Sequence, residues 1–162
     1  MATRAAMIVD LAQLLDHPGP LLGLDVGVKT IGVALSDPGR SLATPLETIK
    51  RTKFTQDANV LLEQVSTRQV GAIVIGLPRN MDGTLGPKAQ SVKTFAKNLA
   101  KQTDLPLAFW DERLSTAAAE RSLIGLDVSR AKRAAVIDSH AAAFILDGAL
   151  DRLKRMGEER SA

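Results

Sequence analysis

The first third of the chain consists of short apolar runs that end in turn residues. The run LLGLDV (21–26) follows Pro20 and is almost uninterrupted, which is typical of a strand buried on both faces. A second run, IGVALSD (31–37), ends in Asp-Pro-Gly, and residues 42–48 have the pattern of a third strand. Closely spaced strands with tight turns predict an antiparallel meander.

From residue 54 onward the pattern alternates between helix and strand. Three segments have the 3.6-residue spacing of amphipathic helices: 54–68, 88–101 and 134–155. Two apolar runs between them predict strands, AIVIG (72–76) and LPLAFW (105–110), and a further short helix is expected over 116–125. The order predicts an α/β domain with a mixed five-stranded sheet, part meander and part parallel crossovers, flanked by helices.

The two ends of the chain differ from this domain. Residues 1–20 predict an extra N-terminal amphipathic helix and a linker, stopped by Pro18-Gly19-Pro20, and two aspartates interrupt its apolar stretch, unlike a signal peptide. No run approaches the ~18 apolar residues of a membrane span, so a soluble protein is expected. Residues 156–162 predict a polar tail, which leaves one domain over 21–155.

Composition narrows the class of protein. The chain has 162 residues, of which 45% are hydrophobic, enough for the core of a single domain. A formal charge of +3 favours a polyanionic partner, although a surplus of this size is equally typical of a surface that only keeps the protein in solution. Cysteine is absent and there are two histidines, which excludes disulfides and thiolate zinc sites and disfavours an imidazole-rich site. A reducing cytoplasm fits this composition.

Carboxylates stand at three places where burial would normally exclude them. Asp25 lies inside an apolar run, Asp111 and Glu112 end another, and Asp138 lies in the apolar helical stretch VIDSHAAAFIL. A buried unpaired carboxylate costs several kcal/mol, and a shared divalent cation would satisfy all of them together. This cost is the reason for grouping the three positions into one candidate site.

Each acidic position also has a purely structural interpretation. Asp25 alone is as typical of a turn before Gly27, and Asp138 of an exposed helix N-terminus, although its neighbours one turn away are alanines that would let the helix approach the sheet. Consecutive strand residues point to opposite faces, so only one of Asp111 and Glu112 is expected to face a shared site. Glu112 is the expected ligand, Asp111 the second choice or a supporting partner.

The donor set indicates the metal and the reaction. Carboxylates without histidine or cysteine form an oxygen site that favours Mg²⁺ or Mn²⁺, with Asp25, Glu112 and Asp138 as ligands. Such sites activate water and stabilise the leaving oxygen of a phosphodiester. The predicted reaction is therefore phosphodiester hydrolysis.

Basic and polar residues around these acids are candidates for contact with nucleic acid. They occur in the loop after strand 72–76, in the turn after Asp25, beside the acidic pair and before the last helix: Arg79, Asn80, Lys29, Thr30, Arg113, Arg130, Lys132 and Arg133. From composition alone, the loop with Arg79 and the turn with Lys29 are equally typical of ordinary connections between secondary-structure elements. The basic residues at 50, 51 and 53 are expected to be solvated, and no aromatic platform for base stacking is predicted.

Four segments, in order and spacing, resemble a known family. LGLDVGVKTIGVALSD, VIGLPRNMDGTLGP, WDERLSTAAAE and IDSHAAAFIL are similar to the four motifs of the YqgF family, also called RuvX or Holliday-junction-resolvase-like, of pre-16S rRNA nucleases. The resemblance runs from about Leu21 to Leu150. Four ordered motifs are a specific signal, whereas the first alone would be weak.

The resemblance implies an RNase H-like fold with sheet order 3-2-1-4-5, magnesium dependence, a cytoplasmic setting and 5′-end maturation of 16S rRNA. It also implies that Asp25, the Asp111–Glu112 pair and Asp138 are the catalytic acids. True junction resolvases carry a further acid one helical turn past the last aspartate, where this chain has Ala141, which favours RNA cleavage. The alternatives are a junction-resolving DNA endonuclease and a non-catalytic scaffold that binds nucleic acid in transcription. Precursor 16S rRNA or the ribosomal particle is the expected partner, and a homodimer stays open.

Overall fold

The computed structural model describes residues 8–80, 82–113 and 130–161, and within 130–139 it describes the backbone only. Seven strands form one mixed sheet around a central β2 (Leu21–Val26). On one side β2 pairs antiparallel with β3 (Thr30–Ser36), which pairs with β4 (Ala43–Pro45). On the other side it pairs parallel with β6 (Ala72–Leu77), followed by the parallel β7 (Leu107–Asp111).

These five strands have the order β4-β3-β2-β6-β7, so the predicted order 3-2-1-4-5 is confirmed. Two strands of two residues each extend the sheet beyond the prediction. β1 (Ile8–Val9) pairs parallel with β7, and β5 (Ile49–Lys50) pairs with β3. Neither is long enough to show the alternation that marks a strand in a sequence.

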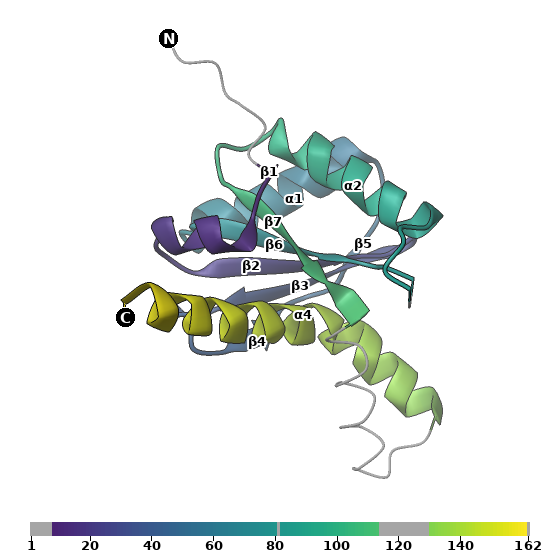
Figure 1. Cartoon of the computed structure of the whole chain (residues 1–162). Helices are drawn as coiled ribbons and strands as arrows, with labels where there is room; N and C mark the ends of the chain where they lie inside the picture. The colour runs from purple at the N-terminus through teal and green to yellow at the C-terminus, as the bar shows by residue number, and fades with distance from the viewer. Residues whose placement is uncertain (1–7, 81, 114–129, 162) are drawn as a thin grey trace.

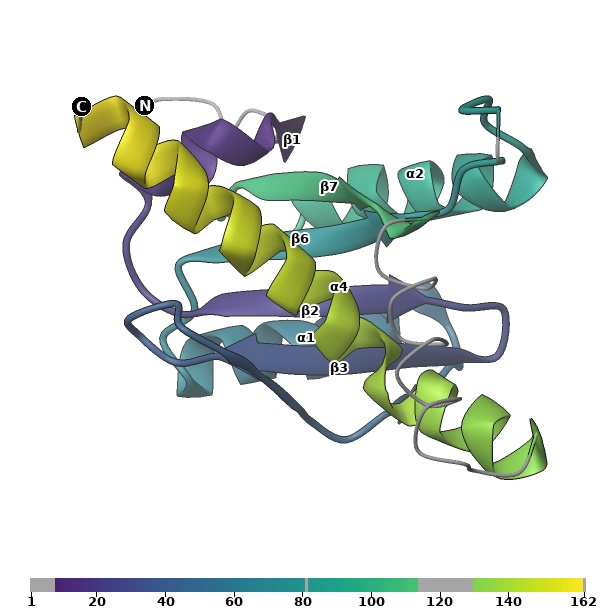
Figure 2. The same ribbon diagram turned by 60° about the horizontal axis from the view of Figure 1, so that its bottom comes forward.

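Helices cover both faces of the sheet. α1 (Phe54–Thr67) and α2 (Pro87–Ala100) pack on one face, where β2 contributes Leu22, Leu24 and Val26 to the core. α4 (Arg130–Ser161) runs obliquely across the other face, as Figure 2 shows. The two faces follow from the two-residue period of a strand, because successive side chains point to opposite sides.

α4 packs close to the sheet through a glycine of β2. A Cβ placed on Gly23 would lie 2.9 Å from the Leu146 Cβ and 3.2 Å from the carbonyl oxygen of Ala142. Both helical residues are buried, so neither has room to move away. A side chain at position 23 would therefore push α4 away from the sheet. Position 23 lies on the same face of β2 as Asp25, so this close contact is beside the acidic residue.

The N-terminal segment differs from its prediction. Within residues 8–20 the expected amphipathic α-helix is instead β1 followed by a six-residue 3-10 helix, η1 (Leu11–Asp16). The guanidinium of Arg40 donates to the carbonyl oxygens of Leu14 and Gly19, each at 2.9 Å, and to that of His17. A partner distant in sequence thus satisfies carbonyls that a longer helix would have bonded internally.

The last helix is longer than predicted. It begins at Arg130 and continues through Ser161, so the expected start near residue 134 and end at Arg155 are wrong. Leu153 is buried, Met156 packs beside it, and Arg160 donates to Asp16 of η1 at 2.6 Å. The polar composition of residues 156–161 alone predicts a frayed tail. Their contacts with η1 keep them helical.

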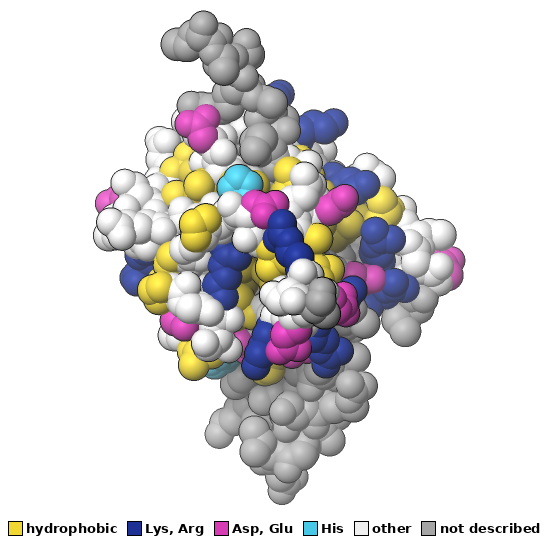
Figure 3. All heavy atoms as spheres, turned by 60° about the vertical axis from the view of Figure 1, so that its left-hand side comes forward, with side chains coloured by type: hydrophobic (Ala, Val, Ile, Leu, Met, Phe, Trp, Pro, Cys, Tyr) yellow, Lys and Arg dark blue, Asp and Glu magenta, His cyan; other side chains and the backbone are white. Residues whose placement is uncertain are grey.

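Acidic and basic side chains are intermingled on the face that carries η1 and the C-terminal end of α4 (Figure 3). No single-sign patch is visible there.

Across the described residues, no helix has the length and apolarity needed to span a membrane. The short helix expected over 116–125 lies outside the described residues.

Candidate active site

Parallel pairing places the carboxyl ends of β2, β6 and β7 at the same edge of the sheet (Figure 1). Asp25 is the fifth residue of β2 and follows Leu21 and Gly23 on the face covered by α4. Glu112 immediately follows β7 and continues the alternation of Ala108 and Trp110 onto the same face. Two strands far apart in sequence thus bring two carboxyl groups together.

A glycine of the intervening strand leaves space between them. β6 lies between β2 and β7, and its Gly76 pairs with Trp110. A Cβ on Gly76 would lie 3.4 Å from Glu112 Oε2 and within 2.5 Å of Ile145 Cδ1. The absence of a side chain at this position lets Ile145 of α4 and the Glu112 carboxyl group share the same surface of the sheet.

The two carboxyl groups interact directly. Burial, the negative charge of Asp25 and a hydrogen bond between the two side chains together raise the pKa of Glu112 from 4.5 to about 7, and burial is the largest cause. The positive charge of Lys88 acts in the opposite direction. Two half-buried carboxyl groups in contact favour a shared proton or a cation, because both cannot be charged without cost.

Asp111 lies in a different environment, although it is the neighbour of Glu112 in sequence. Its carboxylate accepts hydrogen bonds from Arg113 Nη2 at 2.6 Å, from Arg113 Nε at 3.0 Å and from the Arg113 backbone N–H at 3.1 Å. These bonds hold the pKa of Asp111 below its ordinary value. Asp111 is therefore neutralised by an arginine and is not brought together with Asp25.

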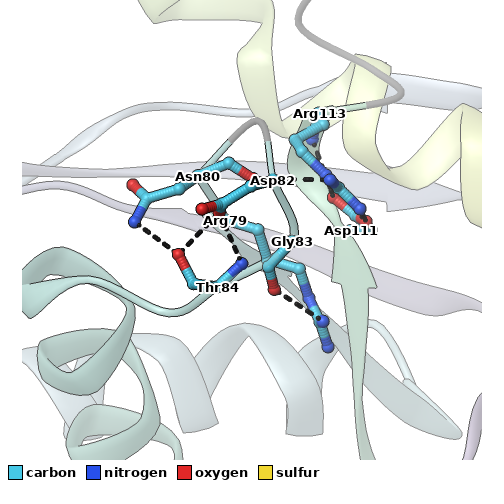
Figure 4. A network of polar contacts seen from close by, with 7 residues as sticks. All are labelled: Arg79, Asn80, Asp82, Gly83, Thr84, Asp111 and Arg113. Atoms are coloured by element: carbon cyan, nitrogen blue, oxygen red, sulfur yellow. Dashed lines mark hydrogen bonds and ion pairs between the residues drawn. The ribbon is translucent and has the colours of Figure 1, made fainter.

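Arg113 also contacts the loop that follows β6 (Figure 4). Its Nη1 lies 3.4 Å from the carbonyl oxygen of Asn80, and the Asn80 side chain donates to Thr84 Oγ1 at 2.9 Å. Asp82 accepts from the hydroxyl and the backbone N–H of Thr84, which lowers the Asp82 pKa. The loop is internally bonded and is tied to the end of β7 by the Asp111–Arg113 pair.

Lys88 was missed by sequence reasoning, which treated it as the first residue of a surface helix. It lies in the first turn of α2, directly after Gly86 and Pro87, and its charge acts on Glu112. Pro at the first helical position marks where the helix begins. That signal places Lys88 at the edge of the loop, although only the fold shows which carboxylate it approaches.

Lys29 and Thr30 are exposed in the turn after Asp25, as expected of contact residues or of a solvated turn. Arg51 corrects the expectation of a solvated loop. Its Nη1 donates to the carbonyl oxygen of Gly27 at 2.6 Å, its guanidinium lies 5.5 Å from the Phe95 ring centroid, and its Nε lies 4.0 Å from the buried Asp57. Arg51 therefore fixes the turn that follows Asp25.

The remaining predicted site residues lie in the N-terminal part of α4. The backbone there is helical, but the side chains of Arg130, Lys132, Arg133 and Asp138 are outside the described residues. Residue 138 stands four positions, one helical turn, before Ala142, whose carbonyl oxygen lies against Gly23. Ala141, the position of the further acid in resolvases, is partly buried.

The side chains fit a divalent cation by their chemistry. Asp25 and Glu112 supply carboxylate oxygens, the ligands that Mg²⁺ prefers, and the sequence has no cysteine thiol. Among the described side chains no group of three potential metal ligands is found. A third carboxylate would therefore have to come from outside them.

The chain is similar to known proteins along most of its length. Residues 19–152 match the RuvX family, described as Holliday junction resolvase. The chain is 62% identical over 146 residues to a Bradyrhizobium protein (strain BTAi1) named "Putative pre-16S rRNA nuclease", covering 90% of this chain and 91% of that one. A Brucella canis protein of the same name is 60% identical over 156 residues, covering 96% and 95%.

Among solved structures, the yeast mitochondrial Holliday junction resolvase Ydc2 is similar in fold, with a TM-score of 0.53, 12% identity and coverage of 93% of this chain and 87% of that one. At this identity the likeness shows the RNase H-like fold alone. The match over residues 19–152 and the identity of about 60% to relatives covered over more than nine-tenths of their length show the family. The chain belongs to the RuvX family.

Proposed function

We propose that this protein is a metal-dependent nuclease that hydrolyses RNA phosphodiester bonds and acts in 5′-end maturation of precursor 16S rRNA. The observation that carries the proposal is the contact between Asp25 and Glu112 at the carboxyl ends of β2 and β7. A half-buried pair of like charges costs stability, and a protein that retains it has a use for it. The names of the relatives support RNA as the substrate.

Asp25 and Glu112 would hold Mg²⁺ or Mn²⁺ together with Asp138. When bound, such a cation would supply an activated water and stabilise negative charge on the leaving oxygen. Asp138 is proposed as the third ligand because residue 138 stands one turn before Ala142, at the part of α4 that contacts β2. Lys88 adds positive charge beside Glu112, which favours approach of a phosphate.

The RNA backbone would be held by basic and polar residues around this edge: Lys29, Thr30, Arg79, Asn80 and Arg113, with Arg130, Lys132 and Arg133 on α4. These groups bind phosphate without reading sequence. Because Asp111 already neutralises Arg113, the net positive charge comes from the lysines and from the other arginines of this set. Recognition by charge and shape fits a cytoplasmic enzyme that acts on a folded RNA or a ribosomal particle.

The decisive experiment replaces Asp25 with Asn and measures Mg²⁺-dependent cleavage of a 16S precursor transcript. Asp151→Asn, an exposed aspartate on α4 that pairs with Arg155, is the matched control. We expect loss of cleavage in the first variant and wild-type cleavage in the second. Cleavage by Asp25→Asn at the wild-type rate would contradict the assignment, and a wild type that binds RNA without cutting it would favour a scaffold.

The description of the family supports a second candidate, cleavage of DNA four-way junctions. Ala141 disfavours it, because an alanine stands where resolvases carry their additional acid. A labelled junction is therefore tested beside the rRNA precursor under the same metal conditions. Preferential cutting of the junction would replace RNA with DNA as the substrate and leave the carboxylate site unchanged.

A further inference from the structure

A groove opens at the edge of the sheet beside the loop of Arg79. It encloses about 480 Å³ between the end of β1, the first turn of η1, β7 and α2. Leu77 and Phe109 provide its apolar part, while Arg79 and Lys93 bring positive charge from two different elements. Asp10 and Gln13 line the η1 side.

The groove lies next to the candidate active site, on the face of β7 opposite to Glu112. Leu77 pairs with Asp111, the residue before Glu112, and Arg79 is close enough to Asp111 for its charge to lower the Asp111 pKa. Phe109 precedes Glu112 by three residues, a distance of roughly 10 Å along an extended strand. A chain bound at Glu112 that passes over the end of β7 would reach the groove within a short distance.

The lining has the chemistry of a nucleotide subsite. Phe109 is half-buried, so part of its ring is available, and aromatic rings bind single-stranded nucleic acid by stacking on bases. Lys93 and Arg79 carry the charges that hold phosphates on either side of a stacked base. Asp10 is suited to accept a hydrogen bond from a ribose hydroxyl or a base amine.

We propose that this groove, the Phe109 groove, binds a nucleotide of the single-stranded RNA that flanks the cut bond, with its base against Phe109 and its phosphates near Arg79 and Lys93. The inference rests on the proposed function, because it places the substrate of that same site. It also revises the expectation from sequence that no aromatic platform exists. A duplex would not bind in this way, since its bases are stacked on one another and offer no free face.

The test measures binding without cleavage. Fluorescence anisotropy with a labelled single-stranded RNA in EDTA gives Kd for wild type, Lys93→Glu and Phe109→Leu, with Lys97→Glu as the control. Lys97 is one turn farther along α2, is exposed and does not line the groove, so its variant makes the same change of charge on the same helix. Thermal melts of all four proteins establish that each is folded.

We expect Kd to rise about tenfold in Lys93→Glu and about fivefold in Phe109→Leu, and less than about twofold in Lys97→Glu. Shortening the RNA on the side that occupies the groove should weaken wild type and abolish the effect of both groove substitutions. Equal Kd values for Lys93→Glu and Lys97→Glu, or substitution effects that do not depend on RNA length, would overturn the inference.

Failure of the groove and failure of the proposed function give different results. If the groove variants bind RNA as wild type does while Asp25→Asn abolishes cleavage, the subsite is wrong and the nuclease stands. If the length-dependent loss of affinity is present while wild type cleaves no RNA, the groove stands and the enzyme assignment is wrong. Equally tight binding of a duplex would replace base stacking with simple charge attraction and also overturn the proposal.

Discussion

Two neighbouring carboxylates at the end of β7 have opposite environments. Glu112 lies on the α4 face against Asp25, and burial together with the charge of Asp25 raises the pKa of Glu112 to about 7. Asp111 lies on the other side of the strand, and Arg113 lowers its pKa through hydrogen bonds from its guanidinium group and its backbone N–H. One acid is held in contact with a like charge, and the other is neutralised.

The difference shows how a strand end can separate two roles. Alternation sends consecutive side chains to opposite faces, so one acidic pair supplies both a member of the candidate metal site and an anchor for the loop that carries Asn80. The proximity of the loop to the site then depends on Asp111, while the chemistry depends on Glu112.

The largest expected effect is on the rate of RNA cleavage, which should distinguish the role of Glu112 from that of Asp111. Glu112→Gln should reduce cleavage of precursor rRNA about a thousandfold, because it removes a ligand charge worth several kcal/mol in the transition state. Asp111→Asn should reduce it about tenfold, since it loosens a supporting partner only. Single-turnover rates at saturating Mg²⁺ make the comparison, and equal losses would show that both acids act in the same way.

The next largest effect is a loss of stability, and it compares Gly23 of β2 with Gly83 of the loop after β6. Gly23→Ala inserts a Cβ against Leu146 and Ala142 and should destabilise the fold by about 2 kcal/mol while moving α4 relative to Asp25. Gly83 has φ 89°, and a Cβ there would lie 3.9 Å from Arg113 Nη1, an ordinary contact, so Gly83→Ala should cost about 1 kcal/mol from backbone strain alone. Urea unfolding measures both, and a larger cost at position 83 would contradict the close packing of α4.

The third prediction concerns pH in metal-free buffer. The pKa of Glu112 is raised in the folded state, so its stabilisation is full below 4.5 and is lost as pH rises through about 7. The pKa of Asp111 is lowered, so its contribution is present above 3.8 and is lost as pH falls through the folded-state pKa.

Melting temperatures between pH 4.5 and 8 should therefore fall less in Glu112→Gln than in wild type, by at least about 2 °C. Asp111→Asn should keep the wild-type slope in this window. Addition of Mg²⁺ at pH 8 should raise the Tm of wild type and have little effect on Glu112→Gln. A pH slope that survives in Glu112→Gln would show that another group titrates.

The smallest effect is expected for Arg113→Lys. The ammonium group keeps the charge but loses the bidentate geometry toward Asp111, and the pair is partly exposed, so the change in unfolding free energy should stay below about 1 kcal/mol. KM for RNA should rise more than kcat falls, because the loop around Asn80 is less restrained. A change in kcat alone would place Arg113 at the reaction itself.

Much of the fold was predictable because its elements have strong local patterns. The run around Asp25 and the helical spacing of 54–68 correspond to β2 and α1 almost residue for residue. The predictions for the ends of α4 and for the secondary structure of residues 8–16 were wrong. The 3-10 helix is held by Arg40, and the C-terminal end of α4 is held by Asp16, and both partners are distant in sequence.

The candidate site was predictable only as a set of residue types. Burial cost alone grouped Asp25 with the acids at 111, 112 and 138. Strand alternation indicated that only one of Asp111 and Glu112 faces the site, and Glu112 was the expected ligand. The roles of Lys88 and Arg51 were not visible, because both follow from contacts between elements: Lys88 approaches Glu112 from α2, and Arg51 crosses to Gly27 from the end of β5.

The sequence by itself determined the α/β order, the buried strands and the presence of acids where apolar residues were expected, because these are encoded in local periodicity and composition. Only the tertiary structure decided that Asp25 contacts Glu112 and that Asp111 is bound by Arg113. The reason is geometric: parallel pairing of β2, β6 and β7 fixes which strand ends meet, and that pairing is a property of the whole sheet.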